Sequence, residues 1–274
     1  MNIGANQTPT AAQRVALARH AGRPNVNDYI AALFTDFFPM AGDRRQGEDA
    51  SILGGPAFYK GCAVTVIGHR KGRTLEENLC VRFAMPNPEG YRKAERLMLQ
   101  AQKFGRPIIT LIDTPGAYPG LEAEARGQGE AIARCLAVMS RLTVPVITVV
   151  TGEGGSGGAL AIGVANRILM LENAVFSVLS PEGFASILWK DASRASQAAE
   201  LMKLTAHDLQ ALGVVDEIIP EPQGGAHTDH AAIFAAVDAA LVRHMAALDG
   251  QSGATLVKNR YKKLRAIGNG KETL

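Results

Sequence analysis

The sequence is short of cysteine, aromatic residues and long apolar runs. Its three cysteines (Cys62, Cys80 and Cys135) are scattered, with no C-x-x-C pair. This excludes a disulfide framework and gives no indication of a zinc site. No apolar run approaches the roughly 18–20 residues that span a bilayer, and the N-terminus lacks the features of a signal peptide. A reducing cytoplasm is therefore the expected location, and no membrane contact is inferred.

The charge is nearly balanced, with 29 Lys and Arg residues against 26 Asp and Glu residues and a net charge of +3. Such a small excess does not indicate a nucleic-acid partner. The basic residues gather late in the chain, at Lys258, Arg260, Lys262, Lys263 and Arg265. A solvated helix face is the plain interpretation of this cluster. A site for anionic phosphates or for a partner is the alternative.

Glycine, in contrast, is plentiful, with 29 residues. Five of them lie within the seven positions from Gly152 to Gly158, between a β-branched run and a small-residue segment typical of a helix. This density lets the backbone approach a ligand closely and leaves the N–H groups at a helix start unobstructed. Packing alone is not expected to require so many glycines.

Alternating apolar patterns predict an α/β protein. Strands are expected at 62–67, 107–112, 145–150, 168–171, 174–178 and 214–219, and the longer helices at 88–104, 122–141, 158–165 and 229–248. Gly54, Gly55 and Pro56 are interpreted as a turn before the first strand. Loops rich in glycine and proline follow three strands, at 113–120, 152–158 and 180–183. Ligands of α/β folds bind at the carboxyl ends of strands, so these loops are the expected site.

The residue patterns of two known motifs match the glycine loop. Gly152-x-Gly154-x-x-Gly157 matches a dinucleotide fingerprint, with Glu172 as its acidic partner. The short helix that follows and the late position in the chain count against that interpretation.

The same loop contains G-x-S-x-G around Ser156, the nucleophile elbow of serine hydrolases. Its acid and base could be Asp216 with His227, or Asp191 with His207. Six histidines in the chain make such a pairing easy to find by chance.

A third interpretation needs no catalytic side chain. Backbone N–H groups of Gly157 and Gly158, at the start of a helix, would stabilise an oxygen that gains negative charge. Each such donor contributes roughly 3 kcal/mol to a transition state. A further N–H could come from Gly116 or Ala117 in the neighbouring loop.

Six segments together resemble one protein family: 68–73, 85–93, 107–120, 152–161, 180–190 and 218–227. They are similar, in order, to the carboxyltransferase α subunits of bacterial acetyl-coenzyme A carboxylase, and the similarity extends over about 13–265. It implies a ClpP/crotonase-like fold of repeated ββα units with flanking helices at both ends. The expected division is a helical segment at 1–50, the crotonase-like domain at 51–250, and a helix and tail at 251–274.

The resemblance implies transfer of a carboxyl group from carboxybiotin, held on a separate carrier protein, to acetyl-CoA. The product would be malonyl-CoA for fatty-acid synthesis. The implied partners are a zinc-ribbon β subunit, a biotin carboxyl carrier protein and a biotin carboxylase, with an α2β2 carboxyltransferase. ATP binding is expected at the level of that complex, and no metal is expected in this chain. An enoyl-CoA hydratase or isomerase shares the implied fold; its carboxylates would be Glu122, Glu124 or Glu182.

In this family the active site lies between the α and β subunits, and a Gly-Gly pair stabilises the ureido oxygen of biotin. By position that pair is Gly157 and Gly158. The other residues expected at the biotin site are Gly116, Ala117, Tyr118, Gly154, Gly155, Ser180, Pro181 and Glu182. The roles of Glu153, Arg126 and the basic C-terminal helix are left open. Glu153 could orient the loop or act on the substrate, and Arg126 could contact a carboxylate or the β subunit or be a solvated helix residue.

Overall fold

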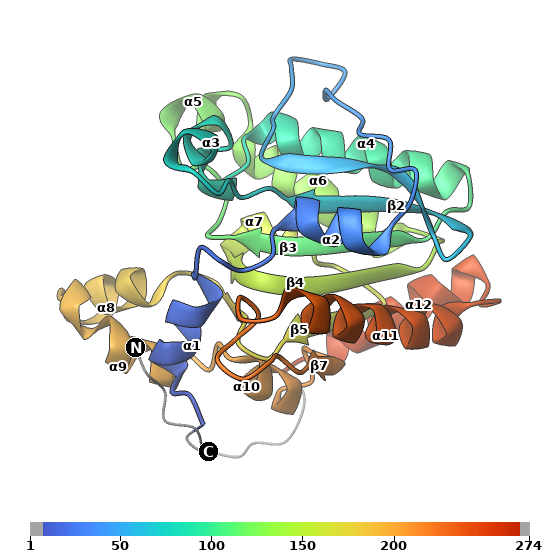
Figure 1. Ribbon diagram of the computed structural model, residues 1–274. Helices are drawn as coiled ribbons and strands as arrows, with labels where there is room; N and C mark the ends of the chain where they lie inside the picture. Colours follow the sequence, from blue (N-terminus) through green and yellow to red (C-terminus); the bar gives the residue numbers. More distant parts are fainter. Residues whose placement is uncertain (1–7, 269–274) are drawn as a thin grey trace.

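The computed structural model describes residues 8–268, in which helices flank one mixed β-sheet (Figure 1). The strands are β1 (Ile52–Tyr59), β2 (Cys62–His69), β3 (Ile108–Thr114), β4 (Val146–Gly155), β5 (Arg167–Leu171), β6 (Val175–Ser177) and β7 (Glu217–Ile219). Their order is β1-β2-β3-β4-β5-β7, with β6 pairing with the far end of β4. Only β1 and β2 are antiparallel to each other. The expected α/β class is confirmed.

The first hairpin differs from the prediction. Gly54, Gly55 and Pro56 lie inside β1 rather than in a turn. The segment before β1 runs alongside this strand, with the Phe38 N–H donating to the Pro56 carbonyl (2.9 Å), and a Cβ on Gly55 would lie 1.9 Å from the Phe38 carbonyl oxygen. Glycine is therefore needed for a close backbone approach, and Pro56 is tolerated because β1 is at the edge of the sheet.

Two pairs of helices pack on the sheet. Helices α4 (Pro88–Lys103) and α6 (Gln128–Arg141) contact each other, as do α2 (Val26–Leu33) and α11 (His230–Leu248) (Figure 1). The remaining helices are α1 (Ala11–Ala18), α3 (Leu75–Cys80), α5 (Leu121–Ala125), α7 (Ser156–Leu160), α8 (Pro181–Trp189), α9 (Ala195–Leu201), α10 (Ala206–Ala211) and α12 (Gly253–Ala266), with 3₁₀ turns at Arg82–Ala84 and Ala192–Arg194.

Several element bounds differ from those predicted. The single helix expected at 122–141 is two helices, because Gly127 adopts a left-handed conformation (φ 86°) between α5 and α6. Strand β4 continues through the glycines to Gly155, so α7 begins earlier and is shorter than the helix expected at 158–165. Helix α3 is not predicted at all; none of its residues is buried, so it leaves no apolar period in the sequence.

Helix α11 is long and apolar on average, although Asp238 and Arg243 interrupt its apolar residues. By length and composition it could span a membrane, the one such helix among residues 8–268. Its Ile233, Val237 and Leu241 are nevertheless buried in the main hydrophobic core. Tyr29 and Leu256, from the two terminal segments, belong to the same core.

The domain bounds at 50 and 250 stay predictions, and the expected tail beyond 268 lies outside the described residues.

Candidate functional site

The three predicted loops meet at one end of the sheet, where α3, α5 and α8 also lie (left in Figure 1). Strands β3 and β4 are parallel neighbours, and Thr114 pairs with Gly154 at their carboxyl ends. Strand β6 joins β4 on its other side, with Gly154 opposite Phe176. A Cβ on Gly154 would lie 2.2 Å from the Phe176 ring, so glycine at this position makes room for β6.

Packing against the β3 loop accounts for two further glycines. A Cβ on Gly152 would lie 2.4 Å from Asp113 Oδ1, and one on Gly155 would lie 2.0 Å from the Pro115 carbonyl oxygen. Gly155 faces backbone at this distance and so requires glycine, whereas a side chain at 152 would have to displace the Asp113 carboxylate. The glycines thus let the β3 and β4 loops pack directly against each other.

The last two glycines of the loop differ from one another. A Cβ on Gly158 would lie 2.5 Å from the Ala117 nitrogen and 2.8 Å from the Tyr91 hydroxyl. A Cβ on Gly157 would meet only Ile132, at an ordinary 3.6 Å. Packing therefore accounts for four of the five glycines, contrary to expectation. Only Gly157 is a glycine that packing does not explain.

Helix α7 starts without a side-chain cap. Its N-cap is Gly155, which offers no side-chain acceptor, and Ser156 has a left-handed φ of 55°. The first N–H groups of an α-helix have no partner within the helix. Gly157 is half-buried and Gly158 is buried at this start. The arrangement can therefore supply backbone donors to an anionic oxygen.

The β3 loop is held by its own hydrogen bonds. The Gly116 N–H donates to Thr114 Oγ1 (3.0 Å), so it is not available to a ligand and Ala117 becomes the candidate donor of this loop. The Tyr118 N–H donates to the Pro86 carbonyl (3.0 Å). The Tyr118 ring, half-buried, lies 5.6 Å from the Arg82 guanidinium. The loop therefore presents Ala117 and Tyr118 from a fixed backbone.

The third loop starts α8. Ser180 caps this helix by accepting the Gly183 N–H (3.1 Å), and the buried Pro181 follows. A cavity of about 30 Å³ brings these residues together with Gly154 and Gly155, as predicted. That volume is the share of about one water molecule. This chain therefore supplies one wall of a ligand site rather than an enclosed pocket.

Charged side chains link the three loops. The Lys71 ammonium contacts Asp113 Oδ1 (2.6 Å) and Glu153 Oε2 (3.4 Å). Arg19 contacts Glu153 Oε1 (2.7 Å) and Glu182 Oε1 (2.7 Å). These contacts border a cleft of about 330 Å³. Glu153 thus orients the loop through cations, and sequence reasoning missed both Lys71 and Arg19.

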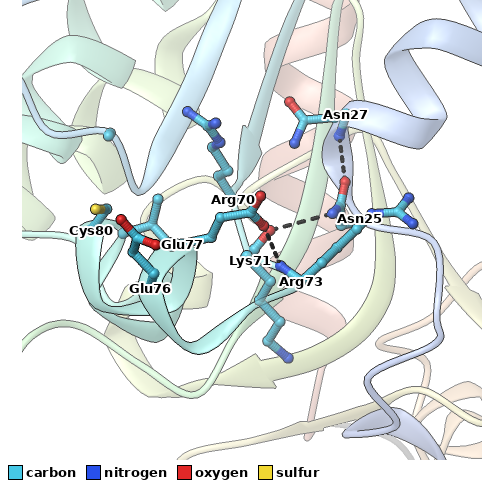
Figure 2. A pocket seen from close by; sticks show the side chains of 11 residues that line it. Asn25, Asn27, Arg70, Lys71, Arg73, Glu76, Glu77 and Cys80 are labelled. Carbon is cyan, nitrogen blue, oxygen red and sulfur yellow. Dashed lines mark hydrogen bonds between the residues drawn. The ribbon is translucent and has the colours of Figure 1, made fainter.

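A second cleft of about 360 Å³ lies beside the first. Arg70 and Lys71 both line this cleft, and Figure 2 shows their side chains extending in opposite directions. The Asn25 side-chain amide donates to the Lys71 carbonyl (3.4 Å) and so joins the segment after β2 to the start of α2 (Figure 2). The β2 loop is therefore tied to the body of the protein.

Two buried polar side chains lie beneath Gly158. Both ring nitrogens of His69 and the hydroxyl of Tyr91 are buried without a hydrogen-bond partner within residues 8–268. Burial lowers the pKa of His69 to about 3, although the neighbouring Gly158 backbone partly favours the charged form. The ring is therefore neutral at physiological pH.

The motifs for a hydrolase and a dinucleotide site are not supported. His227 stacks on His20 at a ring distance of 3.7 Å, and Asp216 pairs with Lys263. Asp191 accepts hydrogen bonds from Ser193. No acid–base pair therefore assembles beside Ser156. The first two glycines of the dinucleotide fingerprint, Gly152 and Gly154, lie in strand β4, and Gly157 lies in the helix that follows, which has only five residues.

The residues suggested for a hydratase are also dispersed. Glu122 and Glu124 are exposed on α5, and Glu182 pairs with Arg19. Arg126, whose role was left open, pairs with Glu89 (2.8 Å) and so holds α5 against α4. Among residues 8–268 no group of three His, Cys, Asp or Glu residues could hold a metal ion.

The basic cluster of α12 is only in part a solvated face. Arg260 is buried and donates to the carbonyls of Met139, Leu142 and Val144 and to Asn166 Oδ1. Lys263 pairs with Asp216. Arg260 therefore completes the carboxyl end of α6, while Lys258 and Lys262 are exposed.

Comparison with known proteins places this site in context. The family model described as "Acetyl co-enzyme A carboxylase carboxyltransferase-like" matches residues 5–268. The chain is 58% identical over 97% of its length to an "Acetyl-coenzyme A carboxylase carboxyl transferase subunit alpha" of Geobacillus sp. (strain WCH70), covering 82% of that protein. The protein of the same name from Sorangium cellulosum is 55% identical, over 95% of this chain and 82% of the relative.

Solved structures with the same fold are more distant in sequence. A Pseudomonas malonate decarboxylase heterodimer has a TM-score of 0.68 and 18% identity, over 89% of this chain and 96% of that one. Transcarboxylase 12S has a TM-score of 0.66 and 21% identity, over 90% of this chain and 46% of that one. These similarities support the expected crotonase-like architecture and concern the fold alone.

Proposed function

The chain belongs to the family of acetyl-coenzyme A carboxylase carboxyltransferase α subunits, and on this premise we propose how its residues serve that reaction. The enzyme is a carboxyltransferase. We assign it the transfer of a carboxyl group from carboxybiotin to acetyl-CoA, with malonyl-CoA as the product. The observation that carries this assignment is 58% identity over 97% of the chain to a relative of that name.

The backbone N–H donors of this site suit the ureido oxygen of a biotin group. Biotin, when bound, supplies the activated carboxyl group for transfer. The free N–H groups at the start of α7 offer Gly157 and Gly158 as donors to an oxygen that gains negative charge, supported by the helix dipole. The Ala117 N–H can add a donor from the β3 loop.

The side chains around these donors bind and orient rather than exchange protons. Tyr118, fixed through its backbone, provides an aromatic wall. Ser180 and Pro181 shape the opposite side where α8 begins. Ser156 has no acid or base assembled beside it, so it is not assigned a catalytic role. The chain needs no metal for these tasks.

Half of the site must come from another chain. The cavity around Gly154, Gly155 and Pro181 has about 30 Å³, far less than a bicyclic ring requires. We therefore assign the second wall and the CoA thioester to a homologous, zinc-ribbon β subunit in an α2β2 assembly. A separate biotin carboxyl carrier protein and a biotin carboxylase would complete the cytoplasmic complex.

Co-expression tests this assignment. The chain is produced with a zinc-ribbon β subunit from a bacterial acetyl-CoA carboxylase, and malonyl-CoA-dependent carboxylation of biotin is measured. Carboxyl transfer is expected for the complex and not for either chain alone. Transfer by the isolated chain would contradict the divided site. An inactive complex of two folded chains would contradict the assigned reaction.

A further inference from the structure

Five charges of alternating sign connect the three loops of the site. They run Asp113–Lys71–Glu153–Arg19–Glu182, here called the charge chain. Its members come from β3, the loop after β2, β4, the end of α1, and α8. We propose that the charge chain holds the oxyanion donors in the positions that carboxyl transfer requires, and that Lys71 is its principal positioning residue.

The inner part of the charge chain locks two loops together. Asp113 Oδ1 accepts a hydrogen bond from the Lys71 ammonium (2.6 Å) and another from the Glu153 N–H (2.9 Å). The same ammonium lies 3.4 Å from Glu153 Oε2. Gly152 permits this arrangement, since a Cβ there would overlap the Asp113 carboxylate. The β3 loop therefore cannot shift along β4 without breaking charged contacts.

Burial makes this inner part the stronger one. The side chains of Lys71, Asp113 and Glu153 are only 24%, 10% and 13% exposed. Although burial opposes the charge on Lys71, the neighbouring carboxylates raise its pKa, so the ammonium is charged at physiological pH. Partly buried charge pairs are screened less by solvent and salt than exposed pairs. Lys71 is thus a fixed cation between two carboxylates.

The outer part extends the charge chain to α8. Arg19 donates to Glu153 Oε1 (2.7 Å) and to Glu182 Oε1 (2.7 Å), and Glu182 lies in the first turn of α8. The side chains of Arg19 and Glu182 are 36% and 46% exposed. Exposed ion pairs contribute little to stability, so this part should have only a small effect on the position of the third loop.

Lys71, Arg19 and Arg23 line the cleft of about 330 Å³ and are already paired with carboxylates, which argues against a separate anion site there. Lys71 and Arg19 are neutralised within the charge chain, and Arg23 is paired with the buried Glu221 (2.7 Å). Positioning is therefore the role that these contacts support. Misplacement of reacting groups by about 1 Å can cost about 10²-fold in rate.

The test uses the assembled carboxyltransferase, because the inference rests on the proposed function. Lys71→Met removes the cation that Asp113 and Glu153 share, so Asp113 loses its cation and Glu153 keeps only Arg19. We expect about 10²-fold lower kcat with little change in the KM for acetyl-CoA. In the unloaded protein, amide hydrogen exchange at 113–118 and 153–158 should become at least about tenfold faster. Lys71→Arg should restore both measurements.

Lys263→Met is the matched control. Lys263 also pairs with a partly buried aspartate, Asp216, with side chains 14% and 24% exposed, but it lies on α12 outside the three loops. It should lower thermal stability without changing kcat or the exchange at 153–158. If Lys71→Met does not fold, Arg19→Met should accelerate exchange at 180–183 and, to a smaller extent, at 153–158, because Arg19 pairs with both Glu182 and Glu153.

The outcomes separate this inference from the proposed function. Wild-type carboxyl transfer together with unchanged exchange and kcat in folded Lys71→Met would overturn the positioning role and leave the function standing. A change in KM alone, or a control that behaves like Lys71→Met, would also overturn it. An inactive wild-type complex would overturn the function, whereas the exchange measurement would still decide the role of Lys71.

Discussion

Protonation of His69 should destabilise this protein at mildly acidic pH. The ring is 1% exposed, both of its nitrogens lack hydrogen-bond partners among the described residues, and its pKa in the folded state is about 3. In the unfolded chain the pKa of histidine is about 6.5. Between these values the unfolded chain binds a proton that the folded chain does not. The free energy of unfolding therefore falls as the pH falls below about 6.5.

The magnitude follows from this pair of pKa values. Linkage gives a slope that approaches about 1.4 kcal/mol per pH unit, and a loss of about 2 kcal/mol between neutral pH and pH 5. Urea unfolding at pH 7.5 and pH 5 measures it for the wild type and for His69→Gln. The variant removes the titrating ring, so its free energy of unfolding should fall by about 2 kcal/mol less than that of the wild type.

Other groups also titrate in this range, so the comparison needs a matched variant. His207 is an exposed histidine on α10, and His207→Gln should retain the pH dependence of the wild type. If the wild type and His69→Gln lose stability in parallel, the ring is not held neutral by burial. The reasoning about this site beneath Gly158 would then be refuted.

Three further predictions concern the loop and its support. Arg260→Met should lower the free energy of unfolding by about 3 kcal/mol, since buried carbonyls lose their donor; urea unfolding measures this, and an unchanged midpoint would contradict it. Gly158→Ala should destabilise the protein and reduce carboxyl transfer, because its Cβ would overlap the Ala117 backbone. Gly157→Ala should change stability by no more than about 1 kcal/mol. Equal shifts of the melting temperature in the two variants would refute this distinction. Ser156→Ala should retain most carboxyl transfer activity; an inactive, folded variant would instead favour a nucleophilic serine.

The central strands and the position of the site could be predicted from the sequence. The apolar runs at 107–112 and 145–150 are strands β3 and β4, because buried parallel strands carry continuous apolar residues. The loops after them form the site, because parallel neighbours end at the same edge of the sheet.

Features that depend on contacts between distant segments could not be predicted. Gly55 resembles a turn residue in the sequence, and only the structure shows the Phe38 backbone packed against it. The glycines at 152 and 155 accommodate Asp113 and Pro115, which are about forty positions away in the sequence. Periodicity also gives no sign that Lys71 would lie between Asp113 and a second carboxylate, since an isolated lysine is ordinarily a solvated residue.

The backbone donors at the start of α7 are the central element of the proposed mechanism. Replacing the Gly157 N–H with an ester oxygen removes one donor and adds no side chain. In the complex with the β subunit, kcat for carboxyl transfer should fall by about 10²- to 10³-fold while the KM for acetyl-CoA changes little. An unchanged kcat in the folded, assembled ester variant would contradict the claim that this N–H stabilises the developing charge.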